Sequence, residues 1–121
     1  MKAVLDINIL VDYLRGIPQV KQEIERYEET HISLITWIGI LVGAEDAEEA
    51  RELRAFLREV ALQQIDQSNA ERAVDLRRQY RMRLPDALIW ATALELGYIL
   101  VTRNSRCFSP DHSGIRIPYQ I

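Results

Sequence analysis

Short apolar runs with strand character alternate with longer segments of helical periodicity along this chain, and this alternation limits the possible folds more than any other feature. Strands that alternate with helices form parallel βαβ units. A chain of 121 residues is long enough for one such domain with its own core. We therefore expect a single α/β domain over residues 1–121, a three-layer α/β/α sandwich around a small, mainly parallel sheet. The expected strands are residues 3–5, 31–35, 62–65, 98–102 and 115–117.

Helix-terminating residues set the expected helix boundaries. Pro18 and Pro85 suit the first turn of a helix, and Gly97 suits its end. Ser68 and Glu71 have the spacing of a capping box, which predicts a helix that starts at Ser68. An apolar stripe over residues 50–61 predicts a helix whose six acids lie on a solvated outer face. The expected helices are residues 7–14, 18–28, 36–43, 45–62, 68–81 and 85–96.

Composition restricts the classes of partner. The single cysteine, Cys107, excludes an internal disulfide and fits a reducing cytoplasm. No apolar run reaches the roughly 20 residues of a membrane helix, and no signal peptide opens the chain, so we expect a cytoplasmic protein without membrane contact. The net charge of −3 does not favour nucleic-acid binding through bulk charge. Binding of phosphates would need local basic patches, or a metal ion between acidic residues and a phosphate.

Three polar residues occupy positions where α/β sheets build their sites. Asp6 and Asn104 directly follow expected strands, and ligands bind outside the carboxyl ends of such strands. Asp86 lies in the first turn of the helix opened by Pro85. Each also has a purely structural explanation: Asp6 as a helix N-cap, Asp86 as an acid at the positive end of a helix dipole, and Asn104 as a turn residue.

Together these residues fall in motifs that are more specific than any one of them. The motifs are L-D-x-N at residues 5–8, LPDALIxATA at 84–93 and LVTRN at 100–104. In this order, and with the ending FSPDHSGIRIPY at 108–119, the chain resembles the PIN-domain family over its whole length. Within that family it is most similar to VapC-type ribonuclease toxins of bacterial type II toxin–antitoxin systems.

The resemblance implies a metal-dependent endoribonuclease with an RNA substrate, a cognate antitoxin partner and a homodimeric state. In the family, acidic residues hold Mg²⁺ or Mn²⁺, which suits ions that prefer hard oxygen ligands. By position, Asp6 matches the first acid of the family, Asp86 the third, and Asn104 a polar position beside the metal. The resemblance therefore assigns catalysis to Asp6, Asp86 and Asn104, and metal binding to Asp6 and Asp86.

The chain departs from the family pattern at three positions that we expect to face one pocket. Ile7 stands where a hydroxyl residue is expected, and Gly39 and Cys107 where acids are expected. A mostly protonated, soft thiol is a poor substitute ligand for Mg²⁺. Gly39 has an alternative explanation, because close packing can require a residue without a side chain. The departures lead to the hypothesis that catalysis is weakened.

Four arginines precede Asp86, and they offer a second way to bind RNA. They could hold phosphates near the pocket, with Tyr80 as a stacking face for a base. The alternative is a solvated helix end favoured by the helix dipole. The arginines are Arg77, Arg78, Arg81 and Arg83.

Two other classes of protein compete with the ribonuclease interpretation. One is a catalytically inactive PIN fold that pairs with an antitoxin or with itself, through apolar grooves between its N-terminal helices. The other is a response-regulator-like receiver. A receiver needs a lysine after its last strand, whereas the only lysines are Lys2 and Lys21. His31 and His112 are too few and too scattered for a zinc site. We expect Trp37 and Trp90 to pack in the core or at a subunit interface.

Overall fold

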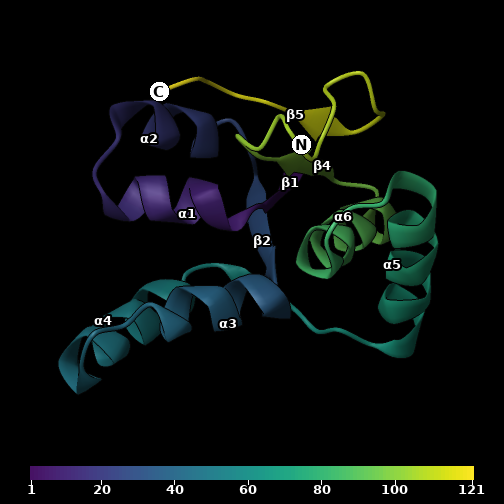
Figure 1. Ribbon diagram of the computed structural model, residues 1–121. Coiled ribbons are helices and arrows are strands. Elements are labelled where there is room, and N and C mark those ends of the chain that lie inside the picture. The colour runs from purple at the N-terminus through teal and green to yellow at the C-terminus, as the bar shows by residue number, and fades with distance from the viewer.

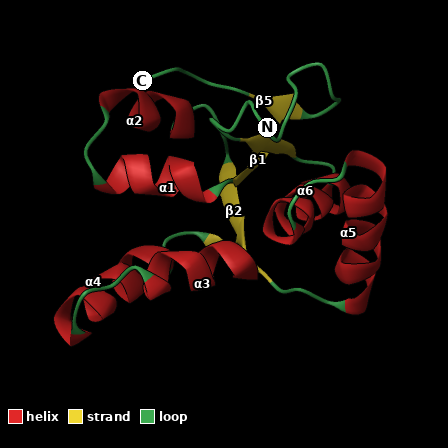
Figure 2. Cartoon of the chain, in the orientation of Figure 1, coloured by secondary structure: helices red, strands yellow, loops and turns green.

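Five strands form one all-parallel sheet in the computed structural model, which describes residues 1–121 (Figures 1 and 2). The strands lie in the order β3-β2-β1-β4-β5. This confirms the α/β class and the three-layer arrangement predicted from the sequence. The strands are β1 (Lys2–Leu5), β2 (Glu29–Ser33), β3 (Ala61–Gln63), β4 (Ile99–Val101) and β5 (Ile115–Arg116). The helices are α1 (Ile7–Leu14), α2 (Pro18–Ile24), α3 (Leu34–Val42), α4 (Ala47–Leu57), α5 (Gln67–Tyr80) and α6 (Leu84–Leu96).

Alternating strand residues build a separate apolar core on each face of the sheet. Ala3, Leu5 and Val101 belong to a core shared with α1–α4. Val4 and Leu100 belong to a core shared with α5 and α6. Successive side chains of a strand point to opposite faces, so neighbouring residues supply both layers. Figure 1 shows the result, with α1 to α4 on one side of the sheet and α5 and α6 on the other.

The sheet brings the ends of β1 and β4 together. These strands are parallel neighbours, and Leu5 pairs with Val101. The chain leaves β1 to reach β2 on one side, whereas β4 adds on the other side. The gap between their carboxyl ends is therefore the point at which connections diverge, where α/β sheets place ligands. Residues directly after Leu5 and Val101 must lie close together there.

Most predicted helix boundaries hold within two residues, but two predicted helices extend too far at their ends. α2 ends at Ile24 rather than near Glu28, and α4 ends at Leu57. Ala61, which the apolar stripe placed in the helix, instead begins β3 and pairs with His31. Apolar periodicity alone does not distinguish the last turn of a helix from a short strand that follows it. In addition, α3 begins at Leu34, inside the predicted strand 31–35, which ends at Ser33 instead.

The predicted capping box at Ser68 is wrong. α5 begins one residue earlier, and the carboxylate of Asp66 accepts a hydrogen bond from the Asn69 N–H at 2.8 Å. The Ser68 hydroxyl instead donates to Glu95 at 2.6 Å. Aspartate is an excellent N-cap, so it satisfies the free N–H groups at the start of this helix.

The predictions for Gly97 and for the two tryptophans agree with the structure. Gly97 ends α6 with a φ of 72°, as its position predicted. Trp90 is buried in the core beside α5, and Trp37 packs partly buried against the other core. No helix of the structure has the length and apolar character that crossing a membrane requires.

Candidate functional site

Asp6 is both the N-cap of α1 and a buried acid at the end of β1. Its backbone is extended, and its Oδ1 accepts a hydrogen bond from the Ile7 N–H at 2.7 Å. The residue is only 2% exposed. The N-cap explanation for Asp6 is therefore correct. The cap uses one hydrogen bond to Oδ1, so Oδ2 can make other contacts.

Two polar side chains hold the other oxygen of Asp6. Oδ2 accepts hydrogen bonds from the Thr102 hydroxyl at 2.7 Å and from the Asn8 amide at 3.2 Å. Burial raises the pKa of Asp6, the bonds from Thr102 and Ile7 oppose that rise, and the charge of Asp86 adds to it. The net pKa is raised, which is the expected cost of burying a carboxylate near a second one.

Asp86 enters the same cavity from the first turn of α6. It is 4% exposed, and its carboxylate lies 3.2 Å from Nε of Arg83. The cavity has a volume of about 290 Å³. The structure thus brings together Asp6 and Asp86, which are 80 positions apart in the chain. The cavity is lined by Asp6, Ile7, Asn8, Arg83, Asp86, Arg103 and Asn104.

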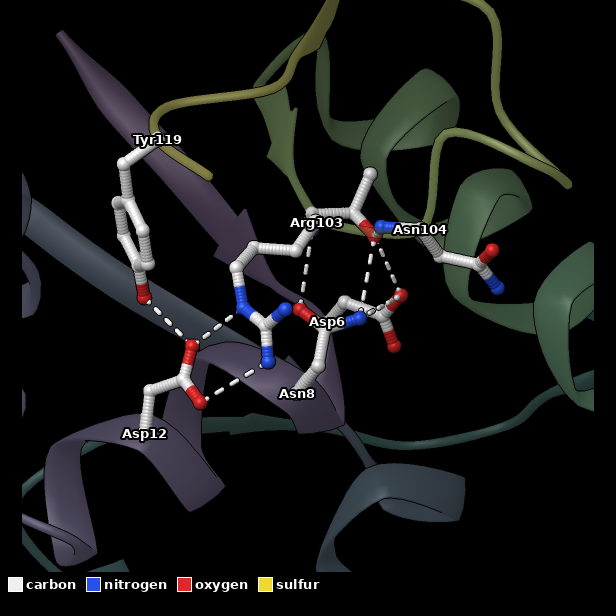
Figure 3. Close-up of polar contacts among 7 residues, drawn as sticks. Asp6, Asn8, Asp12, Arg103, Asn104 and Tyr119 are labelled. Carbon is white, nitrogen blue, oxygen red and sulfur yellow. Dashed lines mark hydrogen bonds and ion pairs between the residues drawn. The ribbon is translucent and has the colours of Figure 1, made fainter. Parts of the chain in front are cut away.

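Asn104 lines this cavity, but its side chain is engaged elsewhere. Its Oδ1 accepts a hydrogen bond from the Cys107 N–H at 3.3 Å, which holds the turn after β4. Its backbone N–H donates to the Thr102 hydroxyl at 3.0 Å. Figure 3 shows the Asn104 amide pointing away from Asp6. The role of Asn104 as a turn residue therefore accounts for its side-chain hydrogen bond. Its backbone N–H connects it to Asp6 indirectly, through the Thr102 hydroxyl.

Sequence reasoning missed the two residues that bond to Asp6 directly. Asn8 lies in the L-D-x-N motif and Thr102 in the LVTRN motif, so both were within quoted patterns without a role. Asn8 also contacts Thr102, with 3.3 Å between its amide nitrogen and the hydroxyl. The signal was present: polar side chains directly follow two neighbouring parallel strands.

Two of the three departures from the family pattern contact each other. A Cβ atom placed on Gly39 would lie 2.7 Å from Cδ1 of Ile7, closer than packed atoms come. Ile7 lines the acidic cavity and also a second groove of about 540 Å³ that Gly39 lines. The Ile7 side chain therefore fills the space next to Gly39. Because Cδ1 is the far end of a flexible side chain, a side chain at position 39 requires only that Ile7 adopts another rotamer.

Cys107, the third departure, lies beside Asp86. Burial raises the pKa of its thiol, and the negative charge of Asp86 raises it further. The thiol is therefore protonated near neutral pH.

The four arginines do not act as one group. Arg77 donates to the backbone oxygen of Met82 at 2.9 Å, so it closes the end of α5. Arg81 ends that helix in the left-handed conformation, with a φ of 57°. Arg83 alone among them lines the acidic cavity. All four are exposed at the surface.

The residues of the cavity fit a hard divalent cation with an incomplete set of acids. No group of three or more histidine, cysteine or acidic residues is arranged so that it could hold a metal ion. Mg²⁺ nevertheless commonly binds through one or two carboxylates and completes its shell with water. Asp6 accepts three hydrogen bonds, whereas a carboxylate offers about four acceptor positions. One acceptor position of the Asp6 carboxylate is therefore without a hydrogen bond.

Comparison with known proteins places this geometry in context. The family model described as PIN domain matches residues 3–110. A solved toxin–antitoxin complex from Klebsiella pneumoniae includes a chain that is 39% identical, with a TM-score of 0.91 over 98% of this chain and 99% of that one. No match was found among curated proteins.

More distant structures share the fold. A DNA-bound VapBC complex from Salmonella typhimurium has a chain with a TM-score of 0.77 and 22% identity, over 96% of this chain and 96% of that one. FitAcB from Neisseria gonorrhoeae has a TM-score of 0.76 and 19% identity, over 98% of this chain and 99% of that one.

Proposed function

This chain belongs to the PIN-domain family, and from that premise we propose that it is a VapC-like toxin, a Mg²⁺- or Mn²⁺-dependent endoribonuclease with weakened catalysis. One observation carries the proposal. Two buried carboxylates, Asp6 and Asp86, come from distant parts of the chain into one cavity at the diverging strand ends. Burying two acids near each other is unfavourable unless a cation compensates their charge.

The residues of the cavity divide the proposed work. Asp6 and Asp86 would hold the metal ion, and such an ion supplies stabilisation of the negative charge that develops on a phosphodiester. Thr102 and Asn8 fix the orientation of the Asp6 carboxylate through the bonds described above. Arg83 is exposed at the rim, where its guanidinium can receive an RNA phosphate.

The proposed partners are an RNA substrate, a cognate antitoxin and a second copy of the chain. The 39% identical relative comes from a toxin–antitoxin complex, which supports an antitoxin partner. The groove of about 540 Å³ between α1, α3 and α4 combines apolar residues with Arg15, Glu45 and Glu49. An amphipathic segment of a partner would suit such a groove.

Weakened catalysis follows from the contact between Ile7 and Gly39. An apolar side chain fills the place where the family resemblance expects an acid. One turn earlier on α3, the buried hydroxyl of Thr36 has no hydrogen-bond partner. A glutamate at position 39 would be three residues away on the same helix face and could accept that bond.

The test compares RNA cleavage by four forms of the chain with Mg²⁺ or Mn²⁺. They are the wild type, Gly39→Glu, Ile7→Thr/Gly39→Glu and Asp6→Asn. We expect slow, chelator-sensitive cleavage by the wild type and none by Asp6→Asn. The double variant should cleave at least about tenfold faster than the wild type, which corresponds to about 1.4 kcal/mol of transition-state stabilisation. Gly39→Glu alone should gain less, because its side chain meets Ile7.

A second function is favoured by the same contact and by the ion pair between Arg83 and Asp86. The Ile7 side chain beside Gly39 and the Arg83 guanidinium bound to Asp86 would suit an inactive PIN fold that only binds an antitoxin or a second copy of itself. Absence of cleavage by the wild type and by the double variant would overturn the ribonuclease proposal in favour of this one.

A further inference from the structure

A fully buried aspartate lies on α1, one helical turn beyond Asn8. Asp12 is 0% exposed, and it accepts hydrogen bonds from two nitrogens of Arg103, with Nη2 at 3.0 Å. The Tyr119 hydroxyl donates to it at 2.8 Å. We call Asp12, Arg103 and Tyr119 the Arg103 cluster (Figure 3). It ties α1 to the turn after β4 and to the C-terminal segment.

The Arg103 cluster continues to the acidic cavity through one backbone bond. The Arg103 N–H donates to Oδ1 of Asn8 at 3.1 Å. Asn8 and Asp12 are four residues apart, so they lie on the same face of α1. Arg103 is thus held twice by this face, through its side chain at Asp12 and through its backbone at Asn8.

This backbone bond determines which way the Asn8 amide faces. An N–H group can donate only to the amide oxygen, so Oδ1 of Asn8 must face Arg103. The amide nitrogen then faces Asp6 and donates to its carboxylate, as observed. If the turn carrying Arg103 shifted, the amide would lose the bond on its oxygen side, and Asn8 would be held only by its contacts with Asp6 and Thr102.

We propose that Asp12 and Arg103 are positioning residues for Asp6, acting through Asn8. The inference rests on the proposed function, in which Asp6 binds a divalent cation. Groups that orient a ligand from behind typically change metal affinity about 10- to 100-fold when they are removed. Neither Asp12 nor the Arg103 side chain has to touch the metal or the RNA for this effect.

A second cluster in the same molecule supplies a matched control. Glu23 accepts hydrogen bonds from Arg116 at 2.7 and 3.1 Å and from the Tyr27 hydroxyl at 2.6 Å. We call Glu23, Arg116 and Tyr27 the Arg116 cluster. Its side chains make no hydrogen bond to the residues that hold Asp6. The backbone oxygen of Arg116 accepts a bond from the Thr102 N–H, and substitution of its side chain leaves this bond in place.

The experiment compares Arg103→Lys with Arg116→Lys. Lysine keeps the positive charge but cannot reproduce the two-pronged bond of a guanidinium to a carboxylate. Two readouts are used: Mn²⁺ affinity by isothermal titration calorimetry, and the side-chain amide resonances of Asn8 in ¹H–¹⁵N NMR spectra without metal. We expect Arg103→Lys to weaken Mn²⁺ binding about tenfold and to shift the Asn8 amide signals. Arg116→Lys should change the affinity less than about twofold and leave those signals in place.

Equal effects of the two substitutions on affinity and on the Asn8 signals would overturn the proposal, as would unchanged Asn8 signals in a folded Arg103→Lys variant. Absence of Mn²⁺ binding by the wild type would instead count against the proposed function, and the metal-free NMR comparison would still decide whether Arg103 orients Asn8. If Arg103→Lys does not fold, Tyr119→Phe and Tyr27→Phe replace the lysine pair. Only Tyr119→Phe should then shift the Asn8 amide, and shifts in both or in neither would contradict the proposal.

Discussion

The Arg103 and Arg116 clusters have almost the same chemistry, but they connect differently to the residues that hold Asp6. In each, a buried carboxylate on an N-terminal helix binds an arginine from the C-terminal part of the chain and a tyrosine hydroxyl. Asp12 is 0% and Glu23 5% exposed, so both carboxylates depend on these partners. The Arg103 N–H bonds to the Asn8 side chain that contacts Asp6, whereas the backbone oxygen of Arg116 bonds only to the backbone N–H of Thr102.

The two clusters therefore allow the stabilising role of a buried ion pair to be separated from a role in positioning Asp6. Burial raises the pKa of Tyr27 and of Tyr119, and the neighbouring carboxylate raises each further, so both hydroxyls keep their protons and act as donors. By burial, charge and hydrogen bonding, the two clusters should contribute similarly to stability. Only their connection to the rest of the structure assigns one of them a part in the function.

The largest effect should come from removing the carboxylate of each cluster. Asp12→Ala and Glu23→Ala each leave an arginine partly buried without its partner. Breaking a buried ion pair by removing one partner costs about 3 to 5 kcal/mol. We expect about 3 kcal/mol, the lower end of that range, because the arginine side chains are 26% and 34% exposed. Urea unfolding should show comparable losses for the two variants. A loss below about 1 kcal/mol in either one would mean that its pair behaves like a surface ion pair.

A smaller effect is expected on the stability of the protein in acid, to which the Glu23 carboxylate of the Arg116 cluster should contribute. Burial alone would raise the pKa of Glu23, but the bonds from Arg116 and Tyr27 and the charge of Arg116 more than offset this, so its pKa is lowered. Its stabilisation is therefore complete above the unfolded-state pKa of about 4.3 and is lost as the pH falls below that value. Thermal unfolding between pH 6 and pH 3 should show a shallower acid decline for Glu23→Gln than for the wild type. Parallel declines would contradict the assignment.

Local patterns sufficed to predict the fold and half of the site. Strand-like and helix-like periodicities depend on neighbouring residues, so they gave the layers and the parallel sheet. Asp6 was placed correctly because a residue that follows a parallel strand must lie at the sheet edge. Asp86 was placed by the family motif around it. The capping residue of α5 was missed because Asp66 and Ser68 are both acceptable caps, and the choice depends on the contact between Ser68 and Glu95.

The rest of the site depends on side-chain directions that spacing does not encode. Asn104 lines the cavity, as its position after β4 predicted, but its Oδ1 accepts the turn bond from the Cys107 N–H, and its catalytic role stays a prediction. Asp12 and Arg103 are 91 positions apart, and each resembles an ordinary surface charge by itself. One signal was available: Asp12 is the only charged residue in the apolar segment INILVDYL, and a buried acid needs a partner.

The central claim is that Asp6 is a metal ligand and not merely a helix cap, and Asp6→Asn tests it most directly. Asparagine caps a helix as well as aspartate does, and it removes a buried charge that lies near Asp86. The amide nitrogen that replaces one carboxylate oxygen cannot accept the hydrogen bonds that Asp6 accepts there, which offsets this gain. Stability in urea should therefore change by no more than about 2 kcal/mol. Calorimetric titration with Mn²⁺ should show binding by the wild type and by the Glu23→Gln control, and at least about 100-fold weaker binding by Asp6→Asn. Equal Mn²⁺ affinity of Asp6→Asn and the wild type would contradict the account.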